Sequence, residues 1–80
     1  MPTIFRVGGL RIVIFPNDHR PAHVHVIGAD GEARIAIGSA TRRPALLEND
    51  RLSRRSIALA LVAIDENHQL LQSKWDEIHG

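Results

Sequence analysis

Apolar and polar residues alternate along the first half of the chain, as they do in strands with one buried face. Residues 3–7 alternate, Gly8-Gly9 follows, and residues 10–15 form a second alternating segment. Two adjacent glycines favour a two-residue hairpin turn, because both central positions of a type I′ turn need a positive φ. The hairpin then places on its more apolar face the side chains of Thr3, Phe5, Val7, Leu10, Ile12 and Ile14.

A second pair of strands is predicted over residues 23–27 and 32–37, with a turn at Asp30-Gly31. A turn of two or of four residues gives the same pairing parity, so the sequence assigns both faces. The face expected in the core carries Val24, Val26, Ala33, Ile35 and Ile37. The opposite face carries His23, His25, Ile27, Arg34 and Ala36.

The apolar period lengthens in the last third of the chain, where residues 52–78 are predicted to be helical. Asp50 or Ser53 can cap this helix. Its apolar seam contains Ile57, Leu61, Ile64, His68, Leu71, Trp75 and Ile78. Residues 52–79 lack glycine and proline, so we expect one continuous helix of about 40 Å. A six-residue strand spans about 20 Å, so the helix overhangs the sheet, bends near residues 65–67 or packs on another chain.

These elements predict an α+β fold in one small domain over residues 1–80. The expected architecture is a small, mostly antiparallel sheet of two β-hairpins packed on one long C-terminal helix. Residues 38–49 show no clear period, although residues 44–47 could add a short fifth strand. Hydrophobic residues make up 44% of the chain, which indicates a folded protein. The absence of cysteine excludes disulfides and thiolate zinc sites.

We expect a soluble cytoplasmic protein with no membrane association. The first residues lack the cationic and apolar regions of a signal peptide, and the longest apolar run of the helix, residues 57–64, is too short to span a bilayer. Residues 1–55 carry nine arginines against five acidic residues, a charge of +4, whereas residues 56–80 carry −3. A second basic region could bind an anion or an acidic partner, or simply be solvated, and consists of Arg42, Arg43, Arg51, Arg54 and Arg55.

Three closely spaced histidines, His19, His23 and His25, are candidate metal ligands. Side chains at positions i and i+2 of a strand project to the same side, about 6.5–7 Å apart. Two such imidazoles can bind one divalent metal, and His19 in the preceding loop could be the third ligand. Asp18 is the nearest carboxylate in sequence. The alternative is that these imidazoles only form hydrogen bonds in the loop. No motif points to any other cofactor.

The same histidines are candidates for acid–base catalysis, so enzymatic activity is left open. His23 and His25 could act as base and acid in RNA cleavage, with arginines binding the phosphate. The face that carries these histidines also holds Arg6, Arg11 and Arg34. Arg6 is expected directly opposite Arg11, where like charges repel each other. This surface could therefore bind an anion, a nucleic acid or an acidic partner protein, or its arginines could extend into water.

The end of the helical seam is a candidate interface. If the helix overhangs the sheet, Leu71, Trp75 and Ile78 form an exposed apolar patch, and such patches usually bind a partner. A homodimer or a complex with another protein is therefore expected.

The sequence resembles a bacterial family of short proteins of unknown function, whose members typically carry an N-x-H-x-P-P-H-V-H-V block and a C-terminal E-N…W-x-E segment. Residues 17–26 match the block, with Ala22 in place of the second proline, and Glu66-Asn67 and Trp75-Asp-Glu match the segment. Residues 37–51 match poorly.

Members of that family are often encoded beside another small protein, and such pairs have been suspected of being toxin–antitoxin or regulatory modules. The resemblance implies a protein partner and no particular reaction. The function expected first is therefore a protein-binding component of a two-gene module. A small histidine-dependent RNase and a metal-binding regulator are the alternatives.

Overall fold

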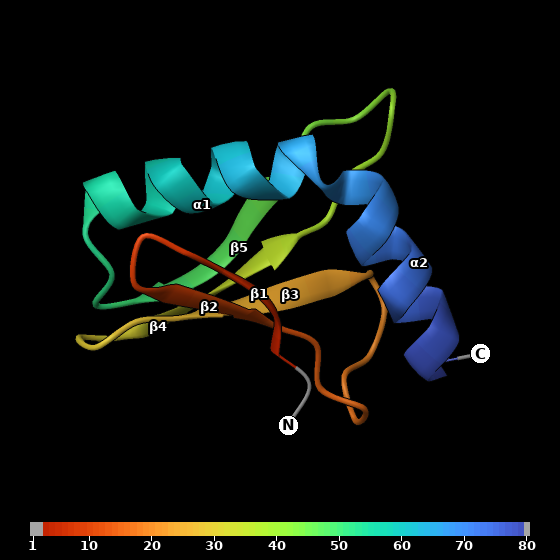
Figure 1. The fold of residues 1–80 in the computed structure, drawn as a ribbon, viewed down its shortest axis with the longest axis horizontal. Helices are drawn as coiled ribbons and strands as arrows, with labels where there is room; N and C mark the ends of the chain where they lie inside the picture. Colours follow the sequence, from red (N-terminus) through yellow and green to blue (C-terminus); the bar gives the residue numbers. More distant parts are fainter. Residues whose placement is uncertain (1–2, 80) are drawn as a thin grey trace.

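Five antiparallel strands form one sheet, and a helix lies across one face of it, in a computed structural model that describes residues 3–79 (Figure 1). The strands follow one another in the sheet in chain order. The elements are β1 (Thr3–Val7), β2 (Leu10–Val13), β3 (His23–Ile27), β4 (Glu32–Ala36), β5 (Ala45–Asp50), α1 (Arg54–Glu66) and α2 (His68–His79). The predicted α+β class and antiparallel sheet are confirmed.

Both predicted hairpins have the expected register, except that a register shift between Thr3 and Phe5 pairs Thr3 with Val13. The predicted place of Thr3 on the core face was therefore wrong, because this irregularity turns Thr3 to the face that carries Arg11. Phe5 pairs with Ile12 and Val7 with Leu10 around the Gly8-Gly9 turn, whose φ values are 50° and 80°. Val24 pairs with Ile35 in the second hairpin. The φ values explain the two glycines, because side-chain-bearing residues rarely adopt this conformation.

The core lies between the sheet and the helices, on the face that the period-two pattern predicts. The strands and their ends contribute Leu10, Ile12, Ile14, Val24, Val26, Ala33, Ile35 and Ile37, all buried. The helices contribute Ala60, Ile64, Leu71 and Trp75. Val13 differs, since it is fully buried although it lies opposite His25 on the other face of the sheet.

The prediction of one continuous helix was wrong, because the helix is interrupted at Asn67. α1 begins after Ser53, whose side chain accepts a hydrogen bond from the Ser56 backbone N–H. At its other end the Asn67 side-chain amide donates to the Ala63 carbonyl at 2.7 Å, and the Asn67 backbone leaves the helical conformation. This side-chain bond satisfies a carbonyl at the helix end and allows the chain to change direction. Of the three expected outcomes, the bend near residues 65–67 is the one found.

The bend determines which residues of the apolar seam are buried. α2 turns away from α1 and passes the end of the sheet where β3 begins (Figure 1). Leu71 and Trp75 are therefore buried in the core, and Ile78 is half-buried against it. The expected exposed patch of these three residues is wrong for Leu71 and Trp75, because their own sheet covers them. No helix in the described chain is long and apolar enough to cross a membrane.

The fifth strand is longer than expected and forms one edge of the sheet. All six residues of β5 are exposed. The register with β4 shifts between Arg34 and Ile35, which leaves Leu47 as an extra residue in β5. The Asn49 side chain accepts from the Leu52 backbone N–H and donates to the Leu52 carbonyl, and so fixes the turn into α1.

Candidate metal centre

Three side chains with metal-ligating atoms meet where the loop after β2 returns to the sheet. They are Asp18 of the loop and His23 and His25 of β3, and they are called here the Asp18–His23–His25 cluster. A tight turn positions the loop residue, because the Phe15 backbone N–H donates to the Asp18 carboxylate at 3.2 Å. The Asp18 N–H donates in turn to the Phe15 carbonyl.

The ligating atoms of the cluster all lie within 4.8 Å of one another. His25 Nε2 is 3.1 Å from both carboxylate oxygens of Asp18. His23 Nε2 is 3.5 Å from Asp18 Oδ2. Two ligands about 2.0–2.1 Å from a tetrahedral zinc ion are separated by about 3.4 Å. The spacing of the cluster therefore fits ligands of one small divalent ion.

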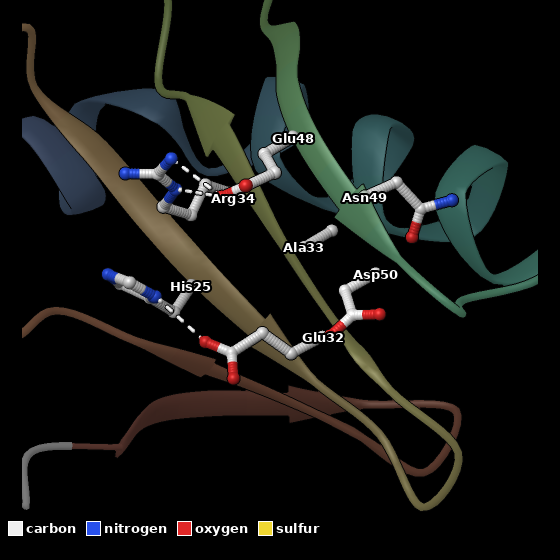
Figure 2. A pocket seen from close by; sticks show the side chains of 7 residues that line it. All are labelled: His25, Glu32, Ala33, Arg34, Glu48, Asn49 and Asp50. Carbon is white, nitrogen blue, oxygen red and sulfur yellow. Dashed lines mark hydrogen bonds and ion pairs between the residues drawn. The ribbon is translucent and has the colours of Figure 1, made fainter.

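Both histidines are held through Nδ1, on the side of the ring away from Asp18. His23 Nδ1 lies 2.8 Å from the Pro21 carbonyl oxygen, which can only accept, so Nδ1 carries a proton. His25 Nδ1 lies 3.1 Å from Glu32 Oε2. Figure 2 shows Glu32 reaching from β4 to the His25 ring. Such outer partners fix the tautomer of metal-binding histidines and leave Nε2 free to ligate.

The cluster is largely shielded from water. The side chains of His23, His25 and Asp18 are 7%, 12% and 15% exposed. The Phe15 ring meets the His25 ring edge-on, with 4.6 Å between the ring centroids. The centroids of the Trp75 and His23 rings are 5.5 Å apart. His23 Nε2 is buried and has no hydrogen-bond partner among residues 3–79. An orphaned buried acceptor is costly unless a ligand or water satisfies it.

Neither histidine of the cluster presents to a substrate a ring nitrogen that is both unpaired and accessible. Both nitrogens of His25 face carboxylates, those of Asp18 and Glu32. In His23, Nδ1 is bonded to a carbonyl and Nε2 is buried. A general acid or base must reach the proton that it transfers. The arrangement therefore favours cation binding over the predicted acid–base role.

The three arginines of the predicted anion surface lie on the same face of the sheet as His25. Arg6 pairs with Arg11 as expected, and the Arg11 guanidinium donates to Thr3 Oγ1 at 3.2 Å. Arg34 forms an ion pair with Glu48 of β5 (Figure 2). The strand registers add more acidic groups to this face, so its carboxylates are Asp18, Glu32, Glu48 and Asp50. These charges offset the arginines and make the surface a poor match for phosphate.

His19, the expected third ligand, is exposed and lies outside the cluster. Asp18, its neighbour, provides the third ligating atom instead. Glu32 was not predicted as a partner of His25, although the strand parity places both side chains on the same face. Glu32 pairs with Ile27, which lies two residues from His25 and on the same face.

The cluster lies inside the region that matches a known family. Residues 9–76 match the model of a family described as "Domain of unknown function (DUF4160)". Comparison with curated proteins and with solved structures gave no match.

Proposed function

We propose that this chain, which belongs to the DUF4160 family of unknown function, is a divalent-metal-binding protein whose ligands are Asp18, His23 and His25. One observation carries the proposal: both imidazole Nε2 atoms lie within 4.8 Å of the Asp18 carboxylate, and both rings are held from behind through Nδ1. Two imidazoles and one carboxylate suit zinc and other late first-row divalent ions.

The number of ligands supports a site with an open coordination position. Three protein ligands leave a place for water or another small ligand, whereas structural zinc sites usually have four protein ligands. The ion would join three parts of the chain: the loop that holds Asp18, the strand β3, and, through the contact of Trp75 with His23, the helix α2. Metal binding would therefore stabilise the fold, and the open coordination position could hold a further small ligand.

Thermal unfolding with and without zinc tests the proposal. At a hundredfold excess over Kd, binding to the folded state adds about 2.7 kcal/mol. For a domain of this size that raises Tm by roughly 10 °C or more. The shift should disappear in His25→Ala and Asp18→Ala. His19→Ala is the matched control, because the exposed His19 should leave the shift unchanged. Wild-type protein whose Tm does not respond to zinc, nickel or cobalt would refute the proposal.

The same variants distinguish metal binding from the alternative of a small RNase. A histidine-dependent RNase would cleave RNA in the presence of a chelator and lose this activity in His23→Ala and His25→Ala. We expect no such cleavage, because neither ring offers an accessible nitrogen.

A second candidate function is binding of another protein, as in the two-gene toxin–antitoxin-like or regulatory module that the sequence resemblance implies. Exposed apolar side chains favour it, namely Leu46, Leu47, Leu59, Val62 and Leu70. Co-purification with the product of the adjacent gene would test this candidate. The cytoplasmic location also stays a prediction.

A further inference from the structure

The edge of the molecule formed by β5 and α1 is apolar along its middle. β5 is the last strand of the sheet, so its outer side pairs with no other strand in the described chain. Leu46 is 45% exposed on β5, and Val62 is 57% exposed on α1. The hollow between the two elements is lined in part by Leu46, Ile57, Ala58 and Leu61. A neighbouring hollow shares Leu61 and adds Pro44 and Val62.

Charges of opposite sign flank this apolar strip. On α1, Arg54 lines the hollow at the beginning of the helix, and Asp65 lines the neighbouring hollow near its end. β5 runs the other way, since Arg43, just before the strand, lines the same hollow as Asp65 at the end of α1. Asp50, the last residue of β5, lies on the opposite face of the sheet with Glu32 and Glu48, away from this strip. Along the strip, α1 thus has a cationic beginning and an anionic end.

We propose that the β5/α1 edge is the contact surface of a symmetric dimer of this chain. A two-fold axis through the middle of the edge reverses its direction in the second copy. Arg54 of one copy then meets Asp65 of the other, and the two-fold axis repeats this contact at the opposite end. The apolar middles face each other at the same time. A surface that is complementary to itself in this way is what an isologous dimer requires.

The edge fits a second copy better than the other occupants. Addition of a strand from another protein is disfavoured, because the extra residue Leu47 interrupts the edge of β5 and Pro44 directly precedes it. A nucleic acid would gain from the arginines but not from the apolar strip or from Asp65. The proposal is independent of the metal site, since the two share no residue.

Light scattering of the full chain after size-exclusion chromatography measures this association. α1 is about 20 Å long, so the contact is small and we expect a Kd of about 10–100 µM. Arg54→Asp and Asp65→Arg should each shift the protein to monomer, because each places like charges together. The double variant restores opposite charges and should regain the dimer. Arg55→Asp and Glu66→Arg are matched controls, since they make the same charge changes one residue away.

Two results would overturn the proposal. Wild-type protein that stays monomeric at about 1 mM, tenfold or more above the expected Kd, would show that this edge serves another partner or none. A dimer that persists in both single variants, or that the double variant fails to regain while circular dichroism shows it folded, would place the contact elsewhere.

Discussion

Glu32 is the side chain that orients the His25 ring toward Asp18 in the proposed metal site. Its carboxylate holds His25 Nδ1 at 3.1 Å, and the other ring nitrogen then faces Asp18. Loss of such an outer partner typically weakens metal binding about 10–100-fold. We therefore expect Glu32→Ala to weaken zinc binding by this factor in a competition titration with a chelating dye. Stability without metal should change little, because the Glu32 side chain is half exposed.

Glu48→Ala is the matched control, since Glu48 is an exposed carboxylate on the same face that bonds to Arg34 and not to a cluster residue. Equal zinc affinity of Glu32→Ala and wild type would show that Glu32 does not orient His25. Absence of zinc binding in wild type itself would instead reject the site.

The sequence was sufficient to pair His23 with His25, but not to complete the site. Period two fixes their common side of β3, whatever the rest of the chain does. The proposed third ligand lies in a loop, where no period relates neighbouring residues to a direction in space. The sequence favoured His19 for this position over its neighbour Asp18, whereas the turn at Phe15 brings Asp18 to the two histidines.

Trp75 anchors α2, which has few other buried side chains. Only Leu71 and Trp75 of this helix are buried. Trp75 also stacks on His79 at 3.7 Å and contacts the His23 ring. Removing a buried large aromatic side chain costs about 3–5 kcal/mol, so we expect Trp75→Ala to lower the free energy of unfolding by this amount in urea. Leu70→Ala, at an exposed position of the same helix, should change it by less than about 0.5 kcal/mol. Equal effects of the two variants would mean that α2 is not docked as described.

The course of the helices was harder to predict than that of the strands. The strand faces follow from alternation and from two short turns, and they were assigned correctly except at Thr3, where a register shift in β1 breaks the alternation. The helix break depends on one hydrogen bond from the Asn67 side chain to Ala63, and a helical period of apolar residues continues across it. Leu71 and Trp75 thus belong to the apolar seam as predicted, but they pack in the core of their own chain and do not form an exposed patch.

Metal binding and self-association should be separable properties of the whole molecule. The Asp18–His23–His25 cluster lies in β3 and the loop before it, whereas the proposed dimer edge follows β5 and α1. Distant sites without shared partners usually act independently. We expect Arg54→Asp to bind zinc as wild type does, and His25→Ala to dimerise as wild type does, when zinc titration and light scattering are measured on both variants. A loss of both properties in either variant would show that the two sites are coupled.

The most direct test of the metal site uses the single tryptophan of the chain. The Trp75 ring lies 5.5 Å from the ring of His23, and a bound cobalt ion quenches the fluorescence of a nearby indole. Titration with cobalt should quench Trp75 fluorescence with one-to-one saturation, and excess zinc, which has a filled d shell, should displace cobalt and restore it. The quenching should be lost in Asp18→Ala and His25→Ala. Fluorescence that does not respond to cobalt, or that responds equally in these variants, would contradict the proposed site.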